Sequence, residues 1–290
     1  MGRLYFGYGS NLCREDLAAW CRARDYDLLE LTAVAVGFLP DRRLAFTHHS
    51  STRGGGVLDV PESKGSAVRG VVFSLPSPEA GAILDRKEGE GHTYRRFETM
   101  ALAETGSELP VFAYEVENPH RESFVAPPAS YLDVVRKGYA AHGVEASALE
   151  SAARGESHRG AVTGLFVYGT LRQGEERHPV LARHRLVHGA AATTMGTLLD
   201  LGPYPGLILD RSLGAVAGEY YEIPDPAPLF AELDRVETFR GFGDPGSLYR
   251  RAIVRVERTG AIPTLAWTYV YAGSRAGRHE IVSGDWLAHP

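Results

Sequence analysis

Tyr5-Phe6-Gly7-Tyr8-Gly9-Ser10-Asn11-Leu12 stands near the start of the chain, and Leu165-Phe166-Val167-Tyr168-Gly169-Thr170-Leu171 repeats its pattern near the middle. Each stretch is an aromatic or aliphatic run that ends at Tyr-Gly-Ser/Thr, which is typical of a buried strand followed by a sharp turn. Related acidic segments follow downstream, Leu84-Asp85-Arg86-Lys87-Glu88 and Leu233-Asp234-Arg235-Val236-Glu237. Because both segments recur in the same order, we expect two copies of one domain.

The length of 290 residues agrees with two domains. Small and polar residues at 151–160 interrupt the apolar pattern, and we place the domains at residues 1–158 and 159–290. The net charge of −5 and the scattered lysines and arginines argue against nucleic acid and membrane partners. Two cysteines are too few for a disulfide framework, and no apolar segment has membrane-spanning length. These features predict a cytoplasmic protein with a small-molecule ligand.

Short apolar segments and few helical ones predict an α+β fold. Helices are expected at 77–88, 129–142 and 226–237, where Pro, Ser and Gly mark their ends. Strands are expected at 45–47, 56–60, 68–75, 111–116, 197–199, 206–209, 215–221, 252–256 and 265–271. Because strands and helices do not alternate regularly, we predict two tandem barrel-like mixed β-sheets, each flanked by a few helices.

The turn after each Tyr-Gly pair is suited to binding an anion or a developing oxyanion. Glycine tolerates a positive φ, and the turn would present backbone N–H groups beside hydroxyl or amide side chains. The two glutamates, Glu88 and Glu237, each end a predicted helix and precede a glycine-containing loop and a Tyr-Arg pair. A carboxylate in that place is a candidate general base at the rim of a pocket.

The two halves resemble the gamma-glutamylcyclotransferase superfamily. The first half is similar to the long form, through Tyr8-Gly9-Ser10-Asn11-Leu12, Leu84 to Glu88 and Pro128-Ala129-Ser130-Tyr131-Leu132. The second half is similar to the short form, which includes gamma-glutamylamine cyclotransferases and the enzyme that deprotects butirosin, through Tyr168-Gly169-Thr170-Leu171 and Gly202-Pro203-Tyr204-Pro205-Gly206. One departure is Thr238, which follows Glu237 where the family usually has glycine, and altered loop geometry is expected there.

The resemblance implies a cyclotransferase that needs no cofactor and no metal. The α-amine of a γ-glutamyl substrate attacks its own γ-amide carbonyl, which releases 5-oxoproline and a free amine. Glu88 and Glu237 would be the acid/base residues, one in each of two pockets. The substrate-binding residues would be Tyr8, Gly9, Ser10, Asn11, Leu12 and Tyr94 in the first half, and Tyr168, Gly169, Thr170, Leu171, Tyr204 and Tyr249 in the second. Two fused copies are consistent with a monomer that acts as a pseudo-dimer.

Proton transfer sets a requirement on both glutamates. An α-ammonium has a pKa of about 8 and a free glutamate one of about 4.3, so an unperturbed carboxylate is a weak base for it. Partial burial beside tyrosine rings would raise the pKa of each glutamate to roughly 6 to 7. We therefore predict a raised pKa for both Glu88 and Glu237.

Two alternatives remain open at the level of sequence. One half could be inactive and kept for scaffold or substrate capture, and Thr238 favours the second half in that role. Both halves could instead bind γ-glutamyl metabolites without turnover, although binding alone does not require the repeated glutamate. Specificity is expected in the loops at 53–56 and 239–246.

Overall fold

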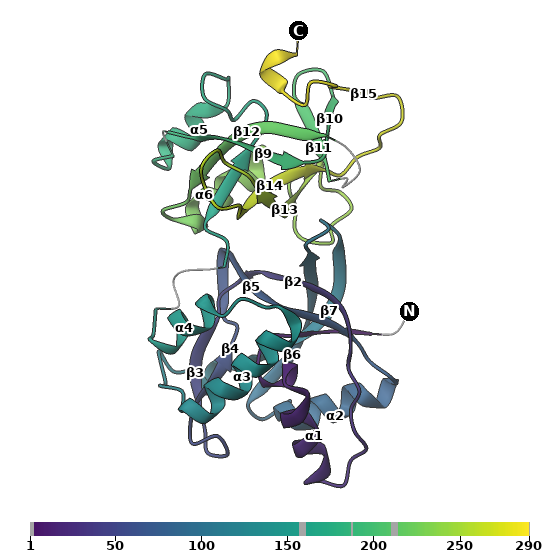
Figure 1. Cartoon of the computed structure of the whole chain (residues 1–290), viewed down its shortest axis with the longest axis vertical. Helices are drawn as coiled ribbons and strands as arrows, with labels where there is room; N and C mark the ends of the chain where they lie inside the picture. Colours follow the sequence, from purple (N-terminus) through teal and green to yellow (C-terminus); the bar gives the residue numbers. More distant parts are fainter. Residues whose placement is uncertain (1–2, 157–160, 187, 210–213, 290) are drawn as a thin grey trace. The chain divides into compact units, whose positions relative to one another are not determined.

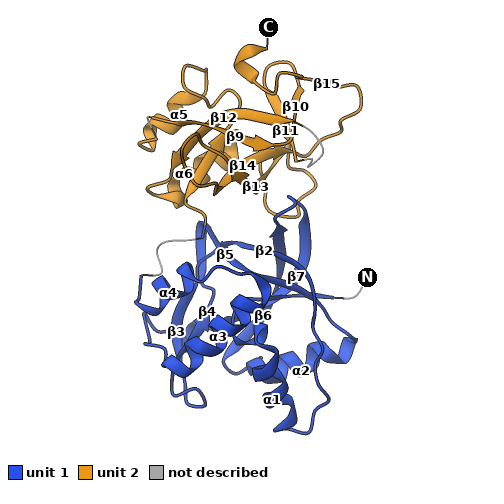
Figure 2. Cartoon of the chain, viewed as in Figure 1, with its two compact units in different colours: residues 1–161 blue, residues 162–290 orange. Residues whose placement is uncertain are grey.

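The computed structural model describes residues 3–156, 161–186, 188–209 and 214–289. The chain folds into two compact units, residues 1–161 and 162–290 (Figure 2). The predicted boundary at residues 158 and 159 lies outside the described residues. Among the described residues, no helix has the length and apolar character needed to cross a bilayer.

The first unit contains a closed five-stranded barrel (Figure 1). In barrel order its strands are β1 (Leu4–Gly7), β5 (Glu62–Ser74), β2 (Thr32–Arg42), β6 (Tyr94–Ala103) and β7 (Glu108–Val116). The strands β1 and β7 are parallel, and the other neighbouring pairs are antiparallel. A separate hairpin joins β3 (Ala45–Ser50) and β4 (Gly55–Asp59). The barrel and the mixed sheet confirm the predicted fold class.

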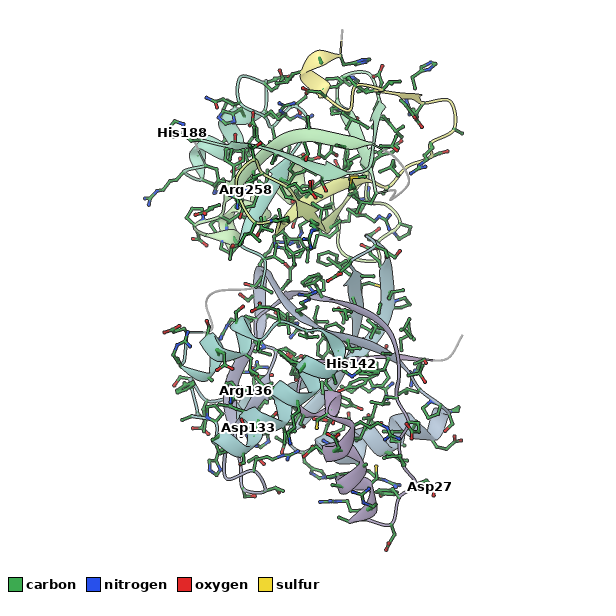
Figure 3. All side chains as sticks on the ribbon, viewed as in Figure 1. Asp27, Asp133, Arg136, His142, His188 and Arg258 are labelled. Atoms are coloured by element: carbon green, nitrogen blue, oxygen red, sulfur yellow. The ribbon has the colours of Figure 1, made fainter. Side chains whose placement is uncertain are left out.

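In the described part of the first unit, four α-helices flank this barrel (Figure 1). The first unit contains α1 (Arg14–Arg22), α2 (Pro78–Glu88), α3 (Ala129–His142), α4 (Ser147–Ala153) and the short 3₁₀ turns η1 (Ser10–Leu12) and η2 (Asn118–His120). The helix α2 begins after Ser77 with Pro78 and ends at Gly89, whose φ of 66° is left-handed. Arg136 of α3 donates from Nε to Glu150 Oε1 of α4 at 2.8 Å (Figure 3).

The helix α3 packs directly against the turn that follows β1. A Cβ atom at Gly138 would lie 2.7 Å from Leu12 Cβ, so only glycine allows this close approach. Tyr139 of α3 donates from its hydroxyl to the backbone oxygen of Tyr8 at 3.0 Å. Helix packing therefore holds the Tyr8 to Leu12 turn in place from behind.

The second unit repeats the sheet in a more open form. Its five-stranded sheet runs in the order β13 (Tyr249–Val256), β14 (Thr264–Tyr271), β8 (Gly164–Val167), β12 (Ala215–Glu222) and β9 (Ala190–Met195). Here β8 lies parallel to β14, as β1 does to β7. Thr193 and Glu257 exchange two backbone hydrogen bonds of 2.9 Å. This bridge connects β9, at one edge of the sheet, to the residue that follows β13, at the other edge. A smaller sheet contains β11 (Pro205–Ile208), β10 (Thr197–Asp200) and β15 (His279–Glu280).

The helices of the second unit are α5 (His178–Arg183), α6 (Pro226–Val236) and the 3₁₀ turn η3 (Trp286–Ala288). The prediction of a single helix in this half was wrong, because α5 also forms. In the first unit the prediction of two helices omitted α1 and α4. Three long strands, β2, β6 and β9, were also not predicted, although the helices at 129–142 and 226–236 appear as expected.

Candidate active sites

The first unit contains a cavity of about 310 Å³ between the end of β1 and the end of α2. Its lining is formed by Tyr5, Tyr8, Gly9, Ser10, Asn11, Leu58, Glu88, Tyr94, Tyr114 and Tyr131. The structure thus brings together all the predicted site residues of this half except Leu12, which is 2% exposed and belongs to the hydrophobic core. Sequence reasoning missed three lining tyrosines: Tyr5, although it begins the repeated motif, Tyr114 and Tyr131.

Asn11 holds the glutamate in this cavity. Its Nδ2 donates to Glu88 Oε1 at 2.7 Å and lies 2.9 Å from the hydroxyl of Tyr5. The Oδ1 atom of Asn11 is buried and has no hydrogen-bond partner in the part of the chain that the structure describes. The side-chain amide of Asn11 therefore holds one carboxylate oxygen of Glu88 in place, and its own Oδ1 atom remains available as a hydrogen-bond acceptor.

The tyrosines around Glu88 act as neutral hydrogen-bond donors. Tyr8 donates to the backbone oxygen of Tyr114 at 2.7 Å, and Tyr94 donates to that of Leu58 at 2.8 Å. Burial raises the pKa of Tyr8, Tyr94 and Tyr131 above the ordinary value of tyrosine, and nearby acidic groups add to this effect. These rings stay protonated at neutral pH and give the cavity a rigid, partly apolar wall.

The second unit has a corresponding cavity of about 400 Å³. Its lining is formed by Phe166, Val167, Tyr168, Gly169, Thr170, Leu171, Arg177, Tyr204, Pro205, Glu237, Tyr249, Thr268 and Tyr269. Every predicted site residue of this half lies in it, while Arg177, Thr268 and Tyr269 were missed. The hydrogen bonds repeat those of the first unit: Tyr168 donates to Tyr269 O at 2.8 Å and Tyr249 donates to Pro205 O at 2.7 Å.

Glu237 meets the requirement set by proton transfer. Burial raises its pKa from 4.5 to about 7, and the positive charge of Arg177 partly opposes that shift. A group with this pKa exists in both protonation states at neutral pH, so it can accept a proton and return it. The predicted shift is confirmed for Glu237, while the same expectation for Glu88 stays a prediction.

The two cavities differ in the turn residue that faces the glutamate in the first unit. Leu171 stands where the first copy has Asn11, so Glu237 lacks the amide donor that Glu88 receives. A hydrogen bond to a carboxylate favours its ionised form, and an apolar neighbour does not. The presence of Leu171 in place of an asparagine is consistent with burial being the main cause of the raised pKa of Glu237.

We expect Leu171→Asn to lower the pKa of Glu237, because the new amide can donate to its carboxylate. In the wild-type protein, the rate at the second site should rise with pH through about 7, as Glu237 becomes the base. In the variant this rise should move to lower pH by about one unit. The pH dependence of kcat/KM, measured with Glu88 replaced by glutamine, tests this. Leu171→Met is the control, and an unchanged profile in Leu171→Asn would contradict the assignment.

The acidic residue three positions before each glutamate anchors the helix to a strand. Tyr114 of β7 donates to Asp85 Oδ1 at 2.6 Å, and Tyr269 of β14 donates to Asp234 Oδ1 at 2.7 Å. An arginine contacts each aspartate as well. Arg96 Nη1 lies 3.4 Å from Asp85, and Arg251 Nε lies 3.0 Å from Asp234. The two units therefore position their glutamates by the same contacts.

Thr238 adopts a left-handed conformation with φ of 53°, close to the 66° of Gly89 at the matching position. The expectation of altered loop geometry was therefore wrong for the backbone at this position. A β-branched residue pays roughly 1 to 2 kcal/mol for this conformation, which the rest of the fold must offset. The first two backbone hydrogen bonds after Glu237 thus match those after Glu88, whereas the loop at 238–248 is longer than the loop at 89–93.

Neither turn glycine has a positive φ, and of the two Gly169 allows a close approach while Gly9 does not require one. Gly9 has φ of −130°, and Gly169 is not among the glycines with positive φ. A Cβ at Gly169 would lie 2.6 Å from Cγ of the Pro205 ring, whereas at Gly9 the nearest atoms lie 3.7 Å away. The sequence-based reason for these glycines was therefore wrong.

We expect Gly169→Ala to lower kcat/KM at the second site by about tenfold, because the Pro205 ring must move into the cavity. The matched control is Gly9→Ala, which meets ordinary van der Waals contacts and should leave the first site within about twofold of wild type. Rates at each site are measured with the glutamate of the other site replaced by glutamine. Equal effects of the two alanines would contradict the role of Gly169.

Comparisons with known proteins relate both halves of this chain to one family. The family model described as "Gamma-glutamyl cyclotransferase, AIG2-like" matches residues 5–133 and again residues 165–288. Gamma-L-glutamyl-butirosin B gamma-glutamyl cyclotransferase of Niallia circulans is 39% identical over 123 residues, which cover 42% of this chain and 74% of that protein. A putative gamma-glutamylcyclotransferase of Vibrio cholerae is 34% identical over 122 residues, which cover 42% of this chain and 93% of that protein. A solved gamma-glutamyl cyclotransferase aligns with a TM-score of 0.45 and 24% identity, covering 55% of this chain and 89% of that one.

The two matched segments account for most of the chain, and one falls in each compact unit. The chain therefore belongs to the gamma-glutamyl cyclotransferase, AIG2-like family. It is an enzyme of the gamma-glutamylcyclotransferase class, as the resemblance implied.

Proposed function

We propose that each unit carries a cyclotransferase site that releases 5-oxoproline and a free amine from γ-glutamyl compounds, with Glu88 and Glu237 as the acid/base residues. The observation that supports this most is the repeated placement of one glutamate, at the end of α2 or α6, inside a tyrosine-lined cavity beside the Tyr-Gly-Ser/Thr turn. A binding module has no need of a carboxylate with a pKa of about 7 in that place. The domains proposed are residues 1–158, of the long form, and 159–290, of the short form.

The turn after the first strand of each sheet would bind the glutamyl end of the substrate. In the first unit, the first hydrogen bond within the turn runs from Leu12 N to Gly9 O at 3.1 Å. The N–H groups of Ser10 and Asn11 precede it, and such leading N–H groups are left without a partner inside the turn. They are suited to hold the substrate α-carboxylate, as Thr170 and Leu171 would in the second unit.

The glutamate then carries protons from the substrate α-nitrogen to the departing nitrogen. Its carboxylate removes one proton from the substrate α-ammonium, and the neutral amine attacks the γ-carbonyl carbon within the same molecule. The new C–N bond closes the five-membered ring, the protonated glutamate gives its proton to the departing nitrogen, and the old amide C–N bond breaks. The regenerated carboxylate takes the second proton from the ring nitrogen and passes it to the released amine, which leaves as an ammonium ion, and no water is consumed. For Glu237 the mismatch with an ammonium of pKa about 8 is only about one unit.

Mass-spectrometric detection of 5-oxoproline from a panel of γ-glutamyl amino acids, amines and aminoglycosides tests this proposal. We expect product from the wild-type chain without added metal or cofactor. Tight binding of these compounds with no 5-oxoproline from any of them would instead support two binding modules. The released amine is identified in the same spectra, which assigns the substrate class.

A further inference from the structure

A wide hollow adjoins the Glu88 cavity. It measures about 1330 Å³ including open solvent, and it shares Ser10, Glu88, Tyr94 and Tyr131 with the smaller cavity. Because the turn that would bind the glutamyl end lines the small cavity, the hollow is the space into which the rest of the substrate would extend.

Positive side chains dominate the wall of this hollow. Four cationic residues line it, and the two acidic ones are Asp16 and Glu88. Arg53 makes a bidentate ion pair with Asp16, at 2.8 and 2.6 Å, and the two charges cancel. The remaining cations are Arg24, Arg86 and Lys87.

Among the described residues, none of these three cations makes an ion pair within 4.0 Å. The guanidinium of Arg24 lies 4.7 Å from the ring centre of Trp20, and Arg86 donates to the hydroxyl of Tyr26 at 2.9 Å. Both contacts orient a guanidinium without neutralising it. Lys87 is partly buried, and desolvation lowers its pKa, with smaller opposing effects from Glu88 and Asp16. A bound anion would offset this cost of desolvation.

The second cavity lacks this excess of positive charge. Arg177 is the single cation that lines it and Glu237 the single anion. At the positions of Arg86 and Lys87, the second copy has Arg235 and Val236, so the helix end before its glutamate carries one cation instead of two. The segment that precedes each glutamate thus has a different charge in the two units.

We propose that the hollow beside Glu88 binds leaving amines that carry more than one carboxylate, such as glutamate or an acidic dipeptide, and that the Glu237 site does not share this preference. The inference rests on the proposed cyclotransferase activity of Glu88. The cations come from two separate segments, Arg24 just after α1 and Arg86 with Lys87 in α2. A leaving amine with one carboxylate could pair with the cation of only one segment. A leaving amine with two carboxylates could pair with Arg24 and with the α2 cations at the same time.

Matched substrates test this proposal. Glu237→Gln confines turnover to the first site, and γ-glutamyl-glutamate is compared with γ-glutamyl-glutamine, which differs by one charge at nearly equal size. We expect kcat/KM to be about fivefold higher for the glutamate compound at low salt, and this ratio to fall as ionic strength rises. In the Glu88→Gln protein, where the second site operates, the ratio should be close to one.

Single substitutions assign the effect to the hollow. Arg86→Gln should lower kcat/KM more for γ-glutamyl-glutamate than for γ-glutamyl-glutamine, so that the glutamate-to-glutamine ratio falls by about two- to fivefold. Arg22→Gln, an exposed arginine of α1 outside the hollow, is the control and should leave the ratio unchanged. Equal rates for both substrates, or a ratio insensitive to Arg86→Gln, would overturn the inference and leave the cyclotransferase proposal standing. No 5-oxoproline from any γ-glutamyl compound would overturn both.

Discussion

Replacing Glu88 and Glu237 with glutamine in one protein is expected to lower 5-oxoproline release by about 10²- to 10⁴-fold, the usual contribution of general acid–base catalysis. Glutamine keeps the size of the side chain and its place at the end of the helix. It cannot take a proton from the substrate amine, and so cyclisation loses its proton carrier. Rates are followed by mass spectrometry of 5-oxoproline under single-turnover conditions.

The single variants Glu88→Gln and Glu237→Gln show how much each site contributes to the rate of 5-oxoproline release. Each should abolish turnover at its own site and leave the other site active, while substrate binding survives at both. Glu79→Gln, an exposed residue in the first turn of α2, is the matched control and should retain full activity. A double variant that keeps wild-type rates would refute the acid/base assignment, and a wild-type rate in one single variant would identify an inactive half.

Arg251→Met is expected to destabilise the second unit by about 3 to 5 kcal/mol, since it removes one partner of a buried ion pair. Arg251 is 1% exposed, and its Nε lies 3.0 Å from Asp234 Oδ1. Its guanidinium also lies about 5 Å from the ring centres of Phe230, Phe239 and Phe242. Methionine fills much of the same volume but leaves the Asp234 carboxylate without this charge.

Urea unfolding of the full chain measures this effect, read out by fluorescence of Trp267, which lies beside Arg251. Arg235→Met is the control, because Arg235 is an exposed residue of α6 and should change the free energy of unfolding by less than about 0.5 kcal/mol. Similar losses in the two variants would show that the buried pair does not stabilise the unit.

The repeated motifs were sufficient to predict the fold class and to place both glutamates beside their turns. They succeed because strand, turn and helix end are local features with strong sequence signals. The strands β2 and β6 were not predicted, because β2 contains Pro40 and Gly37 and β6 begins with a charged, half-exposed Tyr-Arg-Arg. Their strand form depends on pairing with distant neighbours, which no local pattern reveals.

The missed site residues have a similar explanation. Thr268 and Tyr269 reach the second cavity from β14, about thirty residues beyond Glu237, and nothing in their sequence context marks them. Tyr114 reaches the first cavity from β7 in the same way. The repeated Tyr-Arg-Arg at residues 94–96 and 249–251 was a usable signal, since its second arginine contacts the anchoring aspartate in both units.

The tyrosine that donates to Asp85 or Asp234 fixes the position of the last helical turn, and with it the position of the glutamate. With the aspartate tied to a strand, the glutamate three residues later can lie only where helical geometry puts it, about 300° around the axis and 4.5 Å along it. Inserting one residue between them would swing the carboxylate by about 100° and out of the cavity. The spacing is therefore fixed while the residue just before the glutamate can vary, as Lys87 and Val236 show. Each copy can thus change a side chain beside the substrate without changing the position of its catalytic glutamate.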